Sequence, residues 1–366
     1  MRERRSAPGP TIGTLAALAN QGPTWSGVNV SQDTALSLSA VYTCVSLVSD
    51  AVASLPVDVV LTVGESRVPV AGPAWLNQPN PFDRPMDFWG KVMTSLLCDG
   101  NAFVRVFRAG NGKVVALLPL DPRTVRVELT EDGSGVLYKV ADQILFGRDV
   151  VHVRGFATAS SLRGLSPLEN ARQTVGAGLA TEEYAARFFS QGATVSGIVE
   201  HPGTPKPGEA AVLAKMLRKN HAGVKNSHAV GILTGGAQWK QVSVTPEQAQ
   251  FLDTQRFNRL AIAGIFRVPA YYLDPTVASS WGSGVEEQHN FFTSQTLMPW
   301  LVRLEQAFSS LLPTGQSLRF NVNSRMRVKT LERYEAYRTA IEAGFLSVDE
   351  VRALEDREPL SHTSGT

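Results

Sequence analysis

The sequence predicts an α+β fold, and three observations support this class. Val41, Val45 and Val48 recur at spacings of three and four, which is typical of a helix with one buried face. The pattern of residues 101–154 then predicts short apolar strands separated by Gly, Pro and Asp. Helical patterns dominate again from residue 166 onward. We therefore expect a mixed helix and sheet base followed by a largely helical second half.

Composition limits the function classes. The chain has 366 residues, 43% of them apolar, so it can bury a sizeable core in two or three domains. The formal net charge is +2, so bulk charge does not indicate a nucleic-acid partner. Cys44 and Cys98 are the only cysteines, which excludes a disulfide scaffold and a thiolate zinc cluster. Charge or proline interrupts every apolar stretch before it reaches a bilayer-spanning length, so we expect no membrane partner.

The first half begins with a basic arm. Residues 1–30, starting "MRERRSAPGP", are rich in Gly, Pro and Ser. A helix ending at Pro56 follows, and "VDVVLTV" with "SRVPVAG" then predicts a β-hairpin. The pattern "MDFWGKVMTSLLCDG" predicts a second helix, which Gly100 ends.

The second half alternates helices with less regular segments. Ser166 and Pro167 begin a helix that Gly192 ends. Its central "GAGLAT" favours close packing against another helix, since small residues let backbones approach. A short α/β insert follows, then a helix to about residue 266. A loop, a long helix from about Gly284 to Leu311, a strand and a helix pair turning at Gly344 complete the chain.

Enzyme motifs are absent from the sequence. There is no Gly-rich phosphate cradle, dinucleotide fingerprint, zinc-protease motif or nucleophile elbow, and the six histidines are dispersed. We therefore expect no catalytic residue, no metal and no cofactor. One alternative is a hydrolase that uses Ser283, Glu287 and His289, which lie close together in sequence. A catalytic triad must converge in space, however, and Glu286 with Glu287 simply favours a helix N-terminus.

The order of elements carries a stronger signal than any single motif. The stretches that carry it include "LSAVYTCVSLVSDAVASLPVDVV", "NQPNPFDRPMDFWGKVMTSLLCDGNAFVRV", "LRGLSPLENAR", "FNRLAIAGIFRVPAYYLD" and "VEEQHNFFTSQTLMPWLVRLEQAF". Together they resemble the portal protein of tailed double-stranded DNA phages, in the long-tailed branch. The likeness extends over about residues 33–360. A non-channel head–tail structural protein is a second alternative, although such adaptors are generally shorter.

The resemblance implies a portal fold in a cyclic ring, usually of twelve subunits, at one capsid vertex of the virion. Double-stranded DNA would pass through the ring. The implied partners are the terminase large subunit, the head–tail adaptor, and the major capsid and scaffold proteins, met in the host cytoplasm during assembly. The ATPase would reside in the terminase, so this chain would not be an enzyme. The implied parts are an N-terminal arm (1–30), wing (31–165), first stem helix (166–192), clip (193–245), second stem helix (246–268), tunnel loop (269–283), long wing helix with return strand (284–328), and crown with a short tail (329–366).

Two basic groups are candidates for contacts in such a ring. Arg256, Arg259 and Arg267 are expected on one face of the second stem helix, since their offsets are three and eleven. They form either a solvated stripe paired with Asp253 or a row that contacts neighbouring subunits or DNA. We favour the subunit interface, because strong phosphate contacts would resist DNA movement. The second group, in the clip, is a docking or solvated surface made of Lys215, Arg218, Lys219 and Lys225.

The tunnel loop is the candidate DNA-contacting segment. Trp281 either packs against a helix or meets DNA at the narrowest point of the channel. The surrounding side chains are small and uncharged, which suits a surface that DNA slides past. They are Thr276, Ser279, Ser280 and Ser283.

Overall fold

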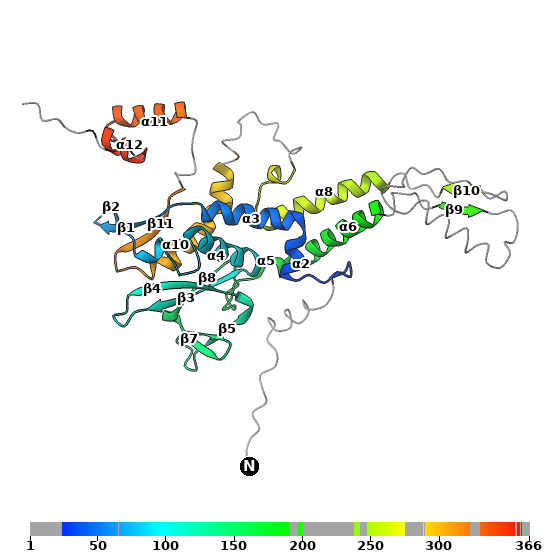
Figure 1. Ribbon diagram of the computed structural model, residues 1–366, viewed down its shortest axis with the longest axis horizontal. Helices are drawn as coiled ribbons and strands as arrows, with labels where there is room; N and C mark the ends of the chain where they lie inside the picture. The colour runs from blue at the N-terminus through cyan, green and yellow to red at the C-terminus, as the bar shows by residue number, and fades with distance from the viewer. Residues whose placement is uncertain are drawn as a thin grey trace, which may run out of the picture. The chain divides into compact units, whose positions relative to one another are not determined.

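The computed structural model of the chain describes residues 24–64, 66–190, 197–200, 238–241, 247–274, 288, 290–322, 330–355, 357–358 and 360. The chain divides into two compact units. The larger unit comprises Met1–Ser54 and Pro73–Pro313, and the smaller comprises Leu55–Gly72 and Thr314–Thr366. Figure 1 shows the course of the chain.

Helices α2 (Gln32–Ser37), α3 (Ser39–Ala53) and α4 (Pro85–Asp99) open the larger unit. Ser31 begins α2 by accepting the Thr34 backbone N–H at 3.1 Å. The valines at helical spacing on α3 are buried, as their spacing predicted, and α3 packs against α4. The predicted end of the first helix is also confirmed, because α3 stops at Ala53, three residues before Pro56.

An aromatic cluster joins α4 to α10 (Met298–Ser309). The Phe308 ring lies 4.8 Å from that of Trp89 and 6.0 Å from that of Phe88, both edge-on. Residues Phe292–Leu297, just before α10, form the π-helical segment η7. Pro299 explains this irregularity, because its ring and missing N–H disrupt the preceding α-helical turn. The predicted long helix to about Leu311 is therefore present in the described residues as a π-helical segment followed by α10, which ends at Ser309.

Two small antiparallel sheets form the β-rich part. The first consists of β3 (Asn101–Arg108), β4 (Val114–Leu120) and β8 (Val150–Arg154) in the order β4-β3-β8. The second consists of β5 (Val125–Leu129), β6 (Val136–Val140) and β7 (Gln143–Phe146) in the order β5-β6-β7. Between the sheets, His152 stacks on Phe103 at 4.2 Å and meets Tyr138 edge-on. The strands predicted over residues 101–154 are thus confirmed.

Three short 3-10 helices complete the base. They are η1 (Ala74–Leu76), η2 (Pro122–Thr124) and η3 (Gly147–Asp149). Within η1, Trp75 and Leu76 are buried. Asp121 caps η2 by accepting the Arg123 backbone N–H at 3.0 Å.

The backbone crosses itself closely just before α5 (Pro167–Asn170). The segment that leads into α5 meets the end of α4 and the strands β3 and β8 there. The Asn101 side chain donates to the Gly164 carbonyl at 2.9 Å and accepts the Gly164 N–H at 2.6 Å. The Ser166 hydroxyl donates to the Cys98 carbonyl at 2.8 Å. The Arg163 guanidinium pairs with Asp99 at 2.7 Å. These bonds fix where the chain enters α6 (Arg172–Ser190), and we call the group the α4–α6 joint.

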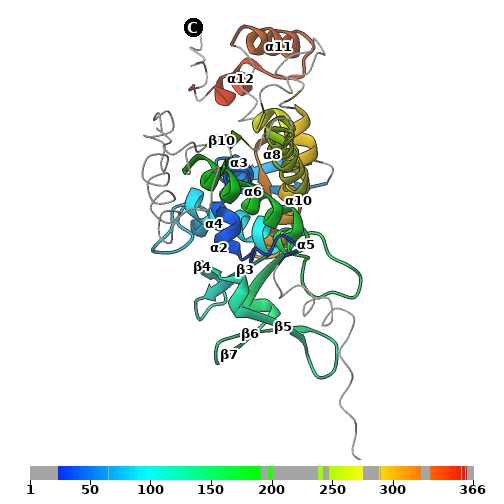
Figure 2. The same cartoon turned by 90° about the vertical axis from the view of Figure 1, so that its right-hand side faces the viewer.

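Beyond the joint, α6 leads to the strand β9 (Gly197–Glu200), which pairs antiparallel with β10 (Gln238–Gln241). Helix α8 (Glu247–Ile265) then returns beside α6, as Figures 1 and 2 both show. A 3-10 turn, η5 (Ala270–Tyr272), follows α8.

The smaller unit contains a third antiparallel sheet, made of β1 (Val57–Val63), β2 (Ser66–Val70) and β11 (Gln316–Phe320) in the order β11-β1-β2. The predicted hairpin is therefore confirmed, with a late strand added at its other side. Helices α11 (Thr330–Glu342) and α12 (Val348–Leu354) follow. Gly344 turns between them with a φ of 69°, and Arg333 of α11 pairs with Glu355 at 2.9 Å.

The α4–α6 joint makes a direct prediction about Gly100. Its φ is 78°, and a Cβ atom there would lie 2.1 Å from the Leu165 carbonyl oxygen. Gly112 is the matched control, because its φ is 81° and its Cβ would meet nothing within 4 Å. We expect Gly112→Ala to lower the free energy of unfolding by about 1 kcal/mol through backbone strain alone. We expect Gly100→Ala to lower it by at least about 2 kcal/mol more, because backbone atoms must move.

Urea unfolding of both variants measures the difference. If Gly100→Ala gives no folded protein while Gly112→Ala does, this also supports the prediction, because the destabilisation then exceeds the stability of the protein. Equal destabilisation by the two substitutions would show that the joint tolerates a side chain.

Candidate functional site

The candidate site is the pair α6–α8 with the turn after α8. Two glycines on α6 allow close packing, as "GAGLAT" predicted. A Cβ on Gly178 would lie 2.8 Å from the Leu38 side chain and 3.5 Å from that of Ile262 on α8. A Cβ on Gly176 would lie 2.7 Å from Thr24. The side chains of Asn258 and Thr181 also meet across the pair at 3.4 Å.

Arg256 points from α8 toward the segment that follows it. Its Nε donates to Asp274 Oδ2 at 2.5 Å, and the Asp274 side chain is only 13% exposed. Asp253 was the partner considered from the sequence; the interaction that the structure gives is with Asp274. This ion pair fixes Asp274, the last described residue before positions 275–287, against α8.

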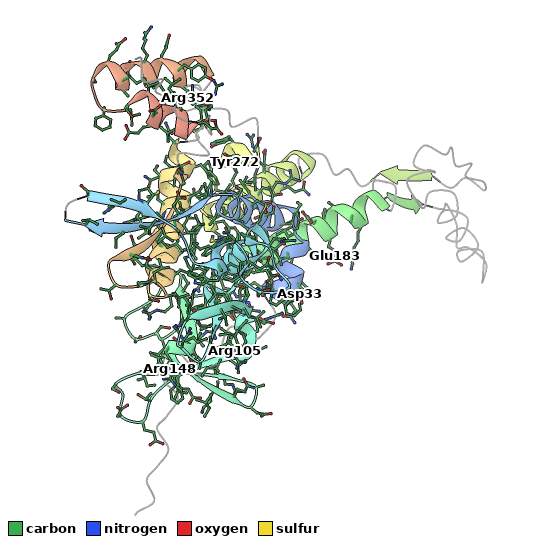
Figure 3. All side chains as sticks on the ribbon, turned by 60° about the vertical axis from the view of Figure 1, so that its left-hand side comes forward. Asp33, Arg105, Arg148, Glu183, Tyr272 and Arg352 are labelled. Carbon is green, nitrogen blue, oxygen red and sulfur yellow. The ribbon has the colours of Figure 1, made fainter. Side chains whose placement is uncertain are left out.

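Arg259 has a different environment. It lies beside a small cavity between α6, α8 and the start of α3, which it shares with Glu182 and Ile262. Glu182 accepts the Ser39 hydroxyl at 2.9 Å. Glu183, one residue further along α6, is exposed toward solvent and is labelled in Figure 3.

Arg267 does not extend the face formed by the other two arginines. Helix α8 ends at Ile265, and Arg267 adopts the left-handed conformation with a φ of 56°. Its N–H donates to the Gly264 carbonyl at 3.1 Å, while the Val268 N–H donates to the Ala263 carbonyl at 2.9 Å. This pair of bonds is a Schellman motif, which ends a helix through a residue in the left-handed conformation. The expectation that Arg267 shares a helix face with Arg256 and Arg259 was therefore wrong.

The turn is anchored from η7. The buried Thr296 hydroxyl donates to the Arg267 carbonyl at 2.6 Å. Phe266 and Val268, on either side of Arg267, are also buried. The left-handed arginine is thus held by its neighbours rather than by its own backbone preference.

Tyr271, which the sequence did not single out, connects the described residues on the two sides of positions 275–287. Its hydroxyl donates to the Gln288 carbonyl at 3.0 Å. Burial, with Tyr272 beside it, raises the pKa of Tyr271, so the hydroxyl stays protonated and able to donate. Tyr272 packs against Phe292 at 5.2 Å, and Figure 3 labels it near this junction. The signal in the sequence was the pair of aromatic doublets "YY" and "FF" that flank the loop.

Several predicted residues lie outside the described ranges. They are the tunnel-loop residues Thr276, Ser279, Ser280, Trp281 and Ser283, the clip residues Lys215, Arg218, Lys219 and Lys225, and the remaining members of the hydrolase alternative, Glu287 and His289. Within the described ranges, no three His, Cys, Asp or Glu side chains gather where they could hold a metal ion. The helices of the described ranges include none that is long and apolar enough to cross a membrane.

Comparison with known proteins decides the family. The sequence pattern of the family described as phage portal protein matches residues 39–356. The chain belongs to the phage portal protein family. It is 36% identical over 373 residues to the probable portal protein of Streptomyces phage phiC31, covering 96% of this chain and 80% of that protein. It is 29% identical to the portal protein of Enterobacteria phage HK97, covering 91% of this chain and 81% of that protein.

Solved structures show the same fold. A chain from the neck of an empty gene transfer agent particle matches with a TM-score of 0.64 at 21% identity, covering 94% of this chain and 98% of that one. A portal protein of the HK97 family from Corynebacterium diphtheriae matches with a TM-score of 0.59 at 17% identity, covering 81% and 96%. The predicted family and the α+β portal fold are therefore confirmed. The hydrolase alternative receives no support from these matches.

The Schellman turn generates a prediction. Arg267→Gly removes the strain of a left-handed arginine, and it should raise the free energy of unfolding by about 0.5–1 kcal/mol. Arg267→Ala is the matched control, because it removes the guanidinium but keeps a Cβ in the strained conformation. Chemical unfolding of both variants measures the effect. A gain of equal size in the alanine variant would show that the guanidinium, not the backbone, is responsible.

Proposed function

We propose that the chain assembles into a closed ring of twelve copies that forms the DNA channel at one vertex of a phage-type capsid. The observation that carries this proposal is the portal family match over residues 39–356, together with the portal fold. One similar structure is the neck of a native gene transfer agent particle computed with C12 symmetry. It matches with a TM-score of 0.61 at 21% identity, covering 89% of this chain and 92% of that one.

The parts of the chain receive their roles from this proposal. Residues 31–165 and 284–328 form the wing, and α6 with α8 forms the stem. Residues 193–245 form the clip, which binds the terminase large subunit during packaging and the head–tail adaptor afterwards. Residues 329–366 form the crown. The major capsid and scaffold proteins surround the ring, which assembles in the host cytoplasm and remains in the virion.

The chain acts as a channel and a docking platform, not as an enzyme. Packaging energy comes from a separate terminase ATPase. The Arg256–Asp274 ion pair and the Tyr271–Gln288 hydrogen bond hold the residues on the two sides of positions 275–287, which supports the proposal that this segment is the tunnel loop. In the ring, these loops, which carry Trp281, meet DNA in the channel.

Of the charged residues, Arg259 and the clip lysines and arginine belong to contacts between proteins. Arg259, exposed at the edge of α8, contacts the neighbouring stem, whereas Arg256 pairs with Asp274 within the chain and the backbone of Arg267 forms the turn beside it. Lys215, Arg218, Lys219 and Lys225 give the clip a basic docking surface. Electrostatic docking of this kind raises association rates and weakens with salt.

The ring predicts the solution mass. Light scattering of the purified chain should give a mass near twelve times 39.5 kDa, because the proposed interfaces close only when the last copy joins. A subunit mass that stays near 39.5 kDa at every protein concentration would contradict the ring.

The loop predicts an effect on DNA retention. Replacing residues 276–283 with a short Gly-Ser link keeps both ion-pair and tyrosine contacts at the base, so folding and ring formation should persist. Particles assembled with this variant should package or retain less DNA, measured as encapsidated genome length. Trp281→Ala in the full-length loop is the control that separates the aromatic ring from loop length. Full-length, stably held genomes in the shortened variant would remove the loop from DNA handling.

A further inference from the structure

A groove with acidic edges opens on the larger unit between α2, α3 and α4. Its volume is about 490 Å³, and its lining includes Asp33, Leu36, Tyr42, Val45, Asp50 and Thr94. Tyr42 is 63% exposed, although its ring is large and mostly apolar. Exposed apolar surface that lines a hollow is typical of a contact site for another chain segment.

The described charged side chains that line the groove are all negative. Among the described residues that line the groove, Asp33 and Asp50 are the two that carry a charge, and both are acidic. Asp33 already has one partner outside the groove, since Arg123 forms an ion pair with its carboxylate at 4.0 Å. The Asp33 side chain remains 84% exposed, and Figure 3 labels it on α2. An occupant with positive charges and aliphatic side chains would complement both the edges and the floor.

The chain itself contains such a segment. Residues 1–23, "MRERRSAPGPTIGTLAALANQGP", precede the described part. Arg2, Arg4 and Arg5 outnumber the single acidic residue, and Ile12, Leu15 and Leu18 supply aliphatic side chains. Fully extended, 23 residues reach about 75 Å, which is enough to cross onto a neighbouring copy.

The point where this arm leaves the fold favours a neighbouring copy. Thr24 packs against Gly176 of α6, and the Trp25 N–H donates to Gln173 at 3.0 Å. The Trp25 side chain is nevertheless 94% exposed. A tryptophan that is tied down by its backbone but left uncovered is expected where a second molecule completes the surface.

We propose that residues 1–23 of one copy bind the groove between α2, α3 and α4 of the adjacent copy in the ring. The arginines pair with Asp33 and Asp50, while the aliphatic residues cover Leu36 and Tyr42. The arm then acts as a staple between neighbours. This inference rests on the proposed ring for its geometry, but it can be tested separately.

Disulfide trapping tests the contact in the full chain. Ser6→Cys or Thr14→Cys on the arm is combined with Ser46→Cys, which lines the groove. The native Cys44 and Cys98 do not interfere, because they are buried and burial raises the pKa of each thiol to about 12. Mild oxidation should give a ladder of covalent dimers and higher species on a non-reducing gel. As a control, the same arm cysteines are combined with Ile144→Cys, which is exposed on β7. The yield of covalent dimers and higher species should then be at least fivefold lower.

A charge exchange tests the recognition. Asp33→Lys with Asp50→Lys should lower the ladder yield at least fivefold, and adding Arg4→Glu with Arg5→Glu should restore at least half of it. The matched control is Glu131→Lys with Asp142→Lys, two exposed acids outside the groove, which should leave the yield unchanged. Circular dichroism confirms that each variant is folded.

Each outcome decides the proposal. Adducts confined to single chains, or no adduct above the Ile144→Cys background, would overturn the staple. Light scattering of the parent protein separates this from the ring itself. If the protein forms rings but no disulfide forms between the arm and the groove, only the arm contact is contradicted. If the disulfide forms between chains but the protein forms no rings, only the ring is contradicted.

Discussion

The structure depends on a close backbone crossing at the α4–α6 joint. Three glycines meet there, since a Cβ on Gly164 would lie 2.2 Å from the Gly100 carbonyl oxygen and one on Gly155 would lie 3.1 Å from it. The buried Asn101 side chain satisfies both the N–H and the carbonyl of Gly164, so the crossing leaves neither backbone group without a partner. The β-rich base, α4 and the start of α6 are therefore fixed to one another.

This constraint connects the fold to the proposed channel. Each copy starts α6 from the same joint, and α8 packs back along α6 through Gly178 and Ile262. The Schellman turn at Arg267 and the Tyr271–Gln288 bond then bring together the described residues on the two sides of positions 275–287. Identical copies that present the same helix pair and loop base can repeat around an axis, which is the geometric requirement for a closed ring.

Much of the fold was predictable because its signals are local. Valine spacing on α3, the hairpin pattern before residue 70 and the stop at Gly100 each follow from short-range preferences. The end of α8 was predicted to within about one residue, but the left-handed conformation of Arg267 was not predictable, since the Thr296 hydroxyl that holds its carbonyl is distant in sequence. The pairing of β11 with β1 joins residues more than 250 positions apart, and the role of Asn101 depends on Gly164. Such contacts leave no periodic trace in a sequence.

Electron microscopy of the purified chain tests the central claim most directly. If the joint and the α6–α8 pair orient neighbouring copies as proposed, class averages should show rings with rotational symmetry and an open axial hole. The hole should remain in the variant that lacks residues 276–283, because the proposed ring contacts lie in the stem and wing. Monomers, open filaments or compact particles without a hole would contradict the proposed channel.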